Sequence, residues 1–458
     1  MTPLNASRRA FLRQASALSL AGTAAPFALN LASIGAASAA TTADYKALVC
    51  VFLYGANDAH NTVAPYDAAG YATYAGVRGT LAWTQAELTP LVPTTALPDG
   101  RQVALPSALA PLAALFDAGQ CAVVANVGPL VMPTDRTSFN NKSVPLPPKL
   151  FSHNDQQSVW QASVPEGAKI GWGGRIGDLL GSQNSNQLFT CNSLTGNAVF
   201  LSGQLVQPFQ IDPAQGSIPF GALNAGTLYG SAAGAAALRT ALTRSHMHLF
   251  ESDLRNVNQR SIDSNTALAA ALAMAPPLTT TFPASNTLAT QLAMVARIIS
   301  VSAELGAKRQ VFMVSLGGFD THSLQDTTHP ALLAQLAGAI DAFQKAMVEL
   351  TAAQKVTLFT ASDFGRTLTV NGDGTDHGWG GHHFVVGGAV KGKQVVGNYP
   401  DLTLNGPTDA GNGRLIPTTS VEQYAATLAT WMGVSATDIP VILPNIGNFA
   451  TQNLGFMG

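Results

Sequence analysis

Short apolar runs alternate along the chain with longer segments in which apolar residues recur at helical spacing. The short runs predict strands at residues 47–53, 121–127, 310–316, 356–360 and 384–386. The longer segments predict helices at 108–118, 288–305, 331–350 and 421–432, the last with Ser420 and Gly433 as its caps. This alternation is typical of a three-layer α/β fold, in which a mostly parallel sheet carries helices on both faces.

The middle of the chain has a different composition. Residues 203–285 are rich in alanine, serine, threonine and glycine, with one helical stretch near 236–273 between proline-containing loops. We interpret this segment as an insertion or cap on a single domain that spans residues 40–458. No repeat of fixed period is visible, which disfavours a solenoid or a propeller.

The first residues have the features of an export signal. Arg8 and Arg9 precede a Phe-Leu step, a weakly apolar stretch follows over 15–34, and Ala-Ser-Ala at 37–39 offers the small side chains of a cleavage site. We predict a twin-arginine signal peptide at residues 1–39, with the twin-arginine translocase as partner during export and a periplasmic or secreted location. An ordinary secretory signal and a retained anchor are the alternatives. No later stretch resembles a stable membrane span.

The charge balance argues against nucleic acid as a partner. The formal charge of −2 becomes −5 without residues 1–39, which hold three arginines and no acid. A mildly acidic chain lacks the electrostatic footprint of a nucleic-acid-binding protein. Charged residues make up only 11% of the chain, so we expect a polar but largely uncharged surface.

The cysteines predict thiols in the core. Cys50, Cys121 and Cys191 are odd in number, so at least one is unpaired. Cys50 and Cys121 lie inside predicted strands, which favours buried thiols over a disulfide framework. None has the Cys-x-x-Cys spacing of a metal or redox site.

Asp and His residues gather directly after the predicted strands, at 55–62, 317–322, 360–367 and 372–383. The carboxyl ends of parallel strands form the edge at which open α/β sheets bind ligands. Carboxylates and imidazoles that converge there suit a divalent cation such as Zn or Mn, which would polarise a phosphoryl or sulfuryl oxygen. For any single Asp, the alternative is a turn residue or a helix cap.

Several familiar motifs are absent from the sequence. There is no Gly-x-Ser-x-Gly, no Gly-x-Gly-x-x-Gly after the first strand and no phosphate-binding loop that ends in Gly-Lys-Ser/Thr. An ordinary α/β-hydrolase nucleophile and a nucleotide cofactor are therefore unsupported. No Cys-x-Pro-x-Arg or Ser-x-Pro-x-Arg run occurs either, which argues against a sulfatase with an oxidised-cysteine nucleophile.

A set of short motifs carries a family resemblance from about residue 45 to the C-terminus. The motifs are Gly-x-Asn-Asp-x-x-Asn-Thr at 55–62, Ser-His-x-x-Gln at 152–156, Gly-Trp-x-Gly-Arg at 171–175, Gly-Phe-Asp-Thr-His at 318–322 and Ser-Asp-Phe-Gly-Arg at 362–366. With these motifs the chain resembles, and is identified as a member of, the bacterial "domain of unknown function 1501" family, which is grouped with the alkaline phosphatase and sulfatase superfamily. The resemblance therefore implies an alkaline phosphatase-like α/β fold.

The resemblance implies one or two divalent metal ions (Zn, Mn, Mg or Ca). The residues that it suggests as ligands are Asp58, Asp320, His322, Asp363, Asp376, His377 and His383. Two departures from the superfamily pattern leave the number of ions open. Asp320 and His322 are two residues apart where the superfamily has four, and Phe364 stands where it has a histidine after the late Asp. His382 and His383 would face opposite sides of a strand, so only one of them is expected at the site.

The resemblance also directs attention to three further residues. Ser152 is the best candidate for a catalytic nucleophile, because it follows a proline-rich loop and begins a helix-like stretch over 154–161 whose amides could receive an oxyanion. Its alternative role is a plain N-cap. Arg366 is a possible anion clamp or the partner of a carboxylate. His60 is an extra ligand or a polar turn residue.

Two functional hypotheses follow from these residues. In the first, the protein is an exported metal-dependent hydrolase of a small anionic phosphate or sulfate ester. In the second, it is a catalytically inactive, exported binding or assembly protein that keeps the fold. Residues 203–285 would then offer a surface to an unknown exported partner protein.

Overall fold

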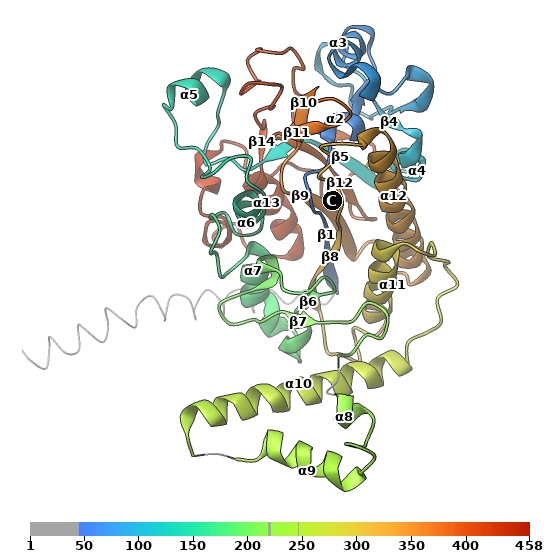
Figure 1. Ribbon diagram of the computed structural model, residues 1–458, viewed down its shortest axis with the longest axis vertical. Coiled ribbons are helices and arrows are strands. Elements are labelled where there is room, and N and C mark those ends of the chain that lie inside the picture. The colour runs from blue at the N-terminus through green and yellow to red at the C-terminus, as the bar shows by residue number, and fades with distance from the viewer. Residues whose placement is uncertain (1–44, 219–220, 246) are drawn as a thin grey trace, which may run out of the picture.

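A nine-stranded sheet forms the centre of the molecule (Figure 1). The computed structural model describes residues 45–218, 221–245 and 247–458, so the predicted signal peptide at 1–39 lies outside the described residues. The strand order is β13–β5–β12–β9–β1–β8–β6–β7, with β14 beside β5. The strands are β1 Lys46–Leu53, β5 Cys121–Gly128, β6 Cys191–Ser193, β7 Phe209–Gln210, β8 Arg309–Leu316, β9 Val356–Ser362, β12 Gly381–Val386, β13 Val395–Val396 and β14 Thr419–Ser420.

The sheet is mostly parallel, as the alternation of elements predicted. Only β12 runs against its neighbours, β5 and β9, among the pairs described. The central strand β1 pairs with β8 and β9 in a register that aligns Leu53 with Leu316 and with Ser362. The three strands therefore end at the same level, and the loops that follow them emerge side by side.

Helices cover both faces of the sheet, which confirms the three-layer prediction (Figure 1). Alternate residues of β1 enter two different hydrophobic clusters, Val49 and Val51 in one and Cys50 and Phe52 in the other, as the two-residue period of a strand requires. The first cluster holds α4 Ala110–Asp117, α11 Thr287–Ser300 and α12 Gln325–Glu349, and the second holds α6 His153–Ala162, α7 Trp172–Leu180, α13 Val421–Met432 and α14 Ile439–Ile442.

Two helices show where local sequence signals predict the bounds of an element and where they do not. Helix α13 has the predicted bounds, with Ser420 and Gln423 in a capping box and Gly433 in the left-handed conformation after its end. Helix α12 begins at Gln325, six residues earlier than the predicted start after Pro330. Its first residue is held by tertiary contacts, because the Gln325 side chain bonds to Asp58 and Thr375.

The helical stretch predicted near 236–273 is two helices. Helix α9 (Ala232–Thr243) and helix α10 (Leu249–Ala273) form a hairpin, preceded by the short α8 (Gly221–Asn224). The C-terminal half of α10 packs into the main core through Leu268 and Leu272. Its N-terminal half projects from the body together with α9 (Figure 1), and we call α8, α9 and residues 249–261 the arm. Strand β7, which lies within the predicted insertion, belongs to the main sheet.

Smaller elements complete the fold. They are α2 Ala59–Thr62, α3 Ala68–Arg78 and α5 Arg136–Asn141, a sheet of β2 Ala64–Pro65, β4 Val103–Pro106 and β3 Leu88–Pro90, and a hairpin of β10 Arg366–Val370 and β11 Thr375–His377. The cysteines Cys50, Cys121 and Cys191 are free and buried, as predicted. Among the described helices, none combines the length and hydropathy that a membrane span needs.

Candidate metal centre

The loops that follow β1, β8 and β9 meet at the carboxyl edge of the sheet. The Tyr54 amide donates to the Leu316 carbonyl at 2.9 Å, and the Phe319 amide returns a bond to the Tyr54 carbonyl at 3.1 Å. Gly55 has φ +107°, and a Cβ at this position would lie 2.5 Å from the Asp320 amide nitrogen. Only glycine permits this close approach of two loops, and the approach places Asp320 beside the end of β9.

Three side chains from two segments form a tight triangle at this edge. The Nε2 atoms of His322 and His377 are 2.9 Å apart, and Asp320 Oδ1 lies 3.1 Å from the first and 3.3 Å from the second. Asp320 and His322 come from the loop after β8, whereas His377 ends β11. The β10–β11 hairpin therefore delivers the second imidazole to the loop that supplies the first.

His153 extends this triangle from the other side. Its Nε2 atom lies 3.1 Å from His377 Nε2 and 3.6 Å from Asp320 Oδ2. His153 is the first residue of α6, so the start of this helix aims the ring at the sheet edge. His153, Asp320 and His377 have ligand atoms that all lie within 4.8 Å of one another.

Hydrogen bonds at the Nδ1 atoms of His377 and His153 set the direction in which these two rings face. The Phe151 carbonyl lies 2.8 Å from His377 Nδ1, and a carbonyl can only accept, so this nitrogen carries the proton. Asp363 Oδ2 lies 2.5 Å from His153 Nδ1 and orients that ring in the same way. Both rings then turn an Nε2 atom towards Asp320, which is the arrangement that outer partners impose on metal-binding histidines.

The charges around the cluster favour a cation between the ligands. Burial alone would raise the pKa of Asp320, but the hydrogen bond and charge of Arg366 outweigh it and lower that pKa. Burial lowers the pKa of His377, so its ring is neutral near pH 7. The hydrogen bond to Asp363 raises the pKa of His153. A carboxylate and a neutral imidazole thus face the same point.

Asp363 is a buried carboxylate with one oxygen engaged and one free. Its Oδ2 atom also accepts from Gln157 Nε2 at 2.8 Å and from the Gly55 amide at 3.3 Å. Its Oδ1 atom is buried and has no hydrogen-bond partner among the described residues. A buried carboxylate oxygen without a partner is costly.

The spacing of these atoms fits a bound metal ion. Ligands at 2.0–2.1 Å from a tetrahedral ion are about 3.3 Å from one another, and the five adjacent pairs of cluster atoms are 2.9 to 3.6 Å apart. The two imidazole nitrogens and one carboxylate of His153, His377 and Asp320, with His322 beside them, suit a borderline ion such as Zn²⁺ better than Mg²⁺ or Ca²⁺. The residues present therefore fit a divalent transition-metal ion.

The structure brings five of the seven predicted ligands to this region. Asp320, His322 and His377 form the triangle, Asp363 orients His153, and Asp376 Oδ1 lies 3.3 Å from His322 Nδ1. Asp376 is about half exposed and approaches from the solvent side.

Asp58 is placed outside the cluster, in a buried ion pair. Arg78 NH1 and NH2 lie 2.6 and 2.7 Å from its two oxygens, and Gln325 Nε2 lies 2.5 Å from Oδ2. Burial alone would raise the pKa of Asp58, but Arg78 lowers it well below the usual range. The structure therefore does not bring Asp58 to the cluster with the other predicted ligands, and a guanidinium occupies both of its oxygens.

His383 and His60 are also placed away from the cluster. The His383 ring packs against Trp160, with ring centroids 4.9 Å apart, and burial lowers its pKa to about 3. His382, its neighbour, accepts from the Asn126 amide and stacks on Tyr399, so the two rings point to different surroundings as expected for a strand. His60 is buried in α2, and burial lowers its pKa to about 4. The structure therefore does not bring His383 together with the other predicted ligands.

Arg366 and Ser152 take local partners. Arg366 NH1 pairs with Asp320 Oδ1 at 2.8 Å, Nε donates to Thr375 Oγ1 at 2.9 Å, and NH2 donates to the Thr375 carbonyl. Of its two possible roles, Arg366 is therefore the partner of a carboxylate. Ser152 occupies the N-cap position of α6, but its hydroxyl donates to Asp155 Oδ2 at 2.9 Å rather than accepting from a backbone amide.

Sequence reasoning missed His153 as a member of the site. It stands next to Ser152 in the Ser-His-x-x-Gln motif, so the motif itself was the available signal. His153 begins a helix and does not follow a strand, so the rule that ligand side chains gather at strand ends does not point to it. Gln157, one turn later on α6, was missed for the same reason.

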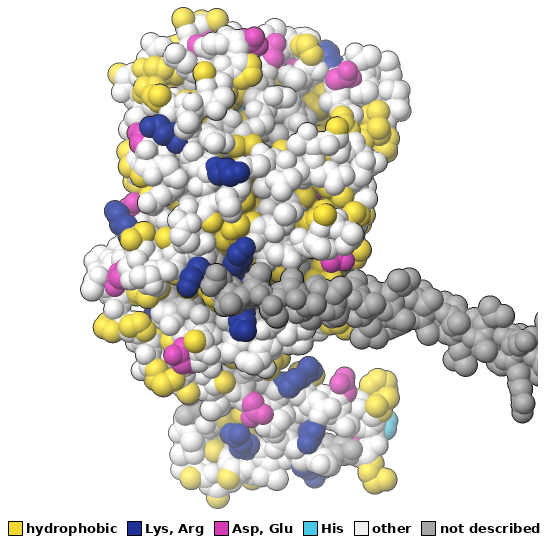
Figure 2. Space-filling model, turned by 180° about the vertical axis from the view of Figure 1, so that it is seen from behind, with side chains coloured by type: hydrophobic (Ala, Val, Ile, Leu, Met, Phe, Trp, Pro, Cys, Tyr) yellow, Lys and Arg dark blue, Asp and Glu magenta, His cyan; other side chains and the backbone are white. Residues whose placement is uncertain are grey.

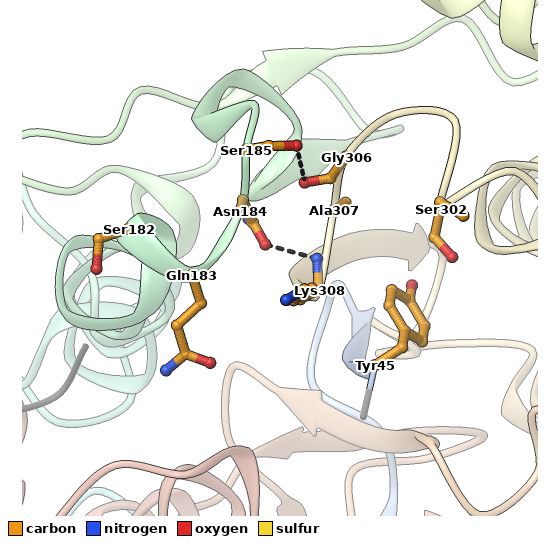
Figure 3. Close-up of a pocket in the computed structure, with 10 residues that line it drawn as sticks. Tyr45, Ser182, Gln183, Asn184, Ser185, Ser302, Gly306, Ala307 and Lys308 are labelled. Carbon is orange, nitrogen blue, oxygen red and sulfur yellow. Dashed lines mark hydrogen bonds between the residues drawn. The ribbon is translucent and has the colours of Figure 1, made fainter. Parts of the chain in front are cut away.

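A cavity of about 510 Å³ lies at the opposite edge of the sheet (Figure 3). Tyr45 and Lys308, at the amino ends of β1 and β8, line it together with Asn184, whose Oδ1 accepts from the Lys308 amide at 2.6 Å. No carboxylate or imidazole lines this cavity. It lacks metal ligands, so the His/Asp cluster remains the candidate for chemistry.

The fold and the cluster define an α/β protein that gathers imidazoles and carboxylates at the carboxyl edge of a mostly parallel sheet. The chain belongs to the family described as "Protein of unknown function (DUF1501)", whose model matches residues 45–437. This match confirms the family that the sequence motifs predicted. No curated protein matches the chain.

Several solved structures are similar to the chain at low identity. The lipoteichoic acid synthase LtaP from Listeria monocytogenes is 9% identical, with a TM-score of 0.33 over 89% of this chain and 74% of that one. A Bacteroides thetaiotaomicron protein from a locus for glycosaminoglycan metabolism is 9% identical, with a TM-score of 0.36 over 87% and 74%. A 2-O GAG sulfatase is 10% identical, with a TM-score of 0.30 over 86% and 71%. Similarity at this level does not identify a substrate.

Proposed function

We propose that the protein is an exported, metal-dependent hydrolase of phosphate or sulfate esters. The observation that carries this proposal is the convergence of His153, His377 and Asp320, whose ligand atoms all lie within 4.8 Å of one another. His322 Nε2 lies beside them, 2.9 Å from His377 Nε2 and 3.1 Å from Asp320 Oδ1. When bound, the ion would polarise the ester's phosphoryl or sulfuryl oxygen and lower the pKa of a nucleophile.

The protein's own residues would prepare the centre in two ways. Asp363 and the Phe151 carbonyl hold the Nδ1 sides of His153 and His377, so that both Nε2 lone pairs stay directed inward. Arg366 keeps Asp320 ionised and fixed in place, because it pairs with Oδ1 from a fully buried position.

Ser152 is our candidate nucleophile, next to the ligand His153. Its hydroxyl already donates to Asp155, which is therefore placed to take the proton as the oxygen attacks. The free amides in the first turn of α6 would face negative charge that develops nearby. The export signal at 1–39 completes the proposal, since transport after folding lets the metal load in the cytoplasm before release to the periplasm or medium.

Elemental analysis of the purified chain, combined with turnover of aryl phosphates and sulfates, tests the proposal. We expect about one transition-metal ion per chain, and hydrolysis that chelation removes and the metal restores. His153→Ala and Asp320→Ala should lose the metal, whereas Ser152→Ala should keep it and lose turnover. His329→Gln, at a buried histidine outside the cluster, is the matched control. A folded wild-type chain without metal under metal-replete conditions would falsify the metal centre.

A second candidate is an exported binding or assembly protein that keeps the fold without the chemistry. One observation favours it. The guanidinium of Arg366 donates hydrogen bonds to Asp320, Thr375 and Gly55, and so is not available to bind an anionic ester. This candidate predicts that the wild type binds stoichiometric metal but hydrolyses neither class of ester. It also predicts that the Ser152→Ala variant keeps the biological activity of the wild type. Both results together would support this candidate over the hydrolase.

A further inference from the structure

Helix α10 carries an apolar stripe on the arm that no described residue covers. Phe250, Leu254 and Val257 are 77%, 61% and 46% exposed. They are spaced four and then three residues apart, so they lie on one face of the helix. Figure 2 shows hydrophobic side chains gathered at the free end of the arm. Exposed large apolar groups in a row are typical of an interaction surface.

Another side of α10 already has a partner in α9. Arg255 Nε donates to the Thr243 carbonyl at 3.2 Å, and Asn258 Nδ2 donates to the Leu242 carbonyl at 3.5 Å. Neither of these residues belongs to the stripe, whose three side chains stay exposed. A partner on it would come from outside this chain.

One flank of the stripe carries two opposite charges at a separation of seven residues. Asp253 and Arg260 are both exposed, and they line a shallow hollow together with Asn256 and Gln259. Neither charged side chain has a hydrogen-bond or ion-pair partner among the residues that the structure describes. Because seven residues make two helical turns, the two charges lie on the same side of the stripe.

We infer that this face is the contact surface of a homodimer, in which α10 packs antiparallel against α10 of a second copy. In an antiparallel pair, the same flank of each helix meets its counterpart with the chain direction reversed. Asp253 of one chain then faces Arg260 of the other, twice by symmetry. Leu254 of each chain faces Val257 of the other. A two-fold contact requires one self-complementary patch, and this patch is self-complementary in both shape and charge.

Sedimentation velocity of the full purified chain across a range of concentrations tests this inference. We expect a reversible monomer–dimer equilibrium that Leu254→Ser weakens at least about tenfold. Val348→Ser, at an exposed valine on α12, is the matched control and should leave association unchanged. All of these side chains are exposed, so circular dichroism should show an unchanged fold.

Charge reversal identifies the partner as a second copy in this orientation. Asp253→Arg and Arg260→Asp, each alone, place like charges opposite one another and should weaken the dimer about tenfold. The double variant restores opposite charges and should recover dimerisation to within about threefold of wild type. A parallel pair or an unrelated interface predicts no recovery. That outcome, or a chain that stays monomeric at every concentration, overturns the inference.

Flotation with vesicles of anionic phospholipid tests whether the stripe binds a lipid surface instead of a second copy of the chain. A chain that is monomeric in solution but floats with vesicles, and loses this on Leu254→Ser, would assign the stripe to a lipid surface and overturn the homodimer. The inference is independent of the proposed chemistry, because it makes no use of the metal centre and its variants should leave metal content unchanged.

Discussion

At the residue scale, two aspartates at the same edge of the sheet have different surroundings. Asp58 and Asp320 both follow a strand and both face an arginine. Asp58 is fully buried and both of its oxygens are bound by Arg78, whereas Asp320 is 46% exposed and shares only Oδ1 with Arg366. The first carboxylate is neutralised inside the core, and the second keeps an oxygen for a ligand.

Replacement of Asp58 by Asn separates a structural carboxylate from a metal ligand. We expect the free energy of unfolding to fall by about 3 kcal/mol or more, because the buried Arg78 loses its counter-charge. We expect the metal content of the folded protein to stay at the wild-type level. Urea unfolding and elemental analysis of the same preparation check both statements. Loss of metal from a well-folded Asp58→Asn protein would return Asp58 to the ligand set.

At the element scale, the site depends on how closely neighbouring loops approach. The loop after β1 touches the loop after β8 at Gly55, and the turn between β10 and β11 touches the same loop at Gly374, where a Cβ would lie 2.3 Å from the His322 carbonyl carbon. These two contacts set the positions of Asp320 and His322. Glycine is required at both because backbone, not a flexible side chain, occupies the space.

Substitution of Gly55 by Ala tests the role of this loop contact. The backbone conformation at φ +107° is strained for alanine, and the clash with the Asp320 amide must push the loops apart. We expect a loss of about 2–4 kcal/mol in the free energy of unfolding, together with weaker metal binding measured by competition with a chelating dye. Gly76→Ala is the control, since Gly76 lies in helix α3 with no atom within 4 Å of the new methyl group, and this change should be neutral or stabilising. Equal behaviour of the two variants would contradict the role given to Gly55.

At the scale of the whole molecule, the core contains several neutral histidines. Burial lowers the pKa of His60 and of His329 to about 4. In the unfolded chain both would titrate near 6.5. Between these values the unfolded state binds more protons than the folded state, so the free energy of unfolding falls as the pH falls from about 6.5 towards 4. His153, whose pKa is raised by Asp363, acts in the opposite direction but is only partly buried.

Acid should therefore destabilise the protein well before its carboxylates titrate. We expect each of His60 and His329 to remove up to about 3 kcal/mol between pH 6.5 and pH 4. Urea unfolding at pH 7.5, 6.0 and 5.0, with a chelator present so that metal release does not contribute, measures this slope. His329→Gln should give a shallower dependence on pH than wild type. A midpoint that is unchanged or higher at pH 5.0 would contradict the expectation.

The amino-acid sequence by itself determined the layers of this fold. Strand periodicity, the Ser420 and Gly433 caps and the burial of the cysteines are properties of short segments, and local rules govern short segments. The sequence motifs also identified the family. They include several of the residues that the structure brings together at the candidate metal centre, because side chains that follow parallel strands must emerge at one edge.

Only the tertiary structure decided which of these side chains meet. Arg78, which lies in a helix twenty residues after Asp58 in the sequence, pairs with that carboxylate. His153 reaches the site from the start of α6, a segment that follows no strand. The break between α9 and α10 likewise has no local glycine or proline to mark it, and it leaves the apolar stripe of α10 exposed on the arm. Such pairings depend on how distant segments pack, because a buried charge is stable only beside an opposite charge from another part of the fold. The pattern of residues within one segment does not determine which partner that is.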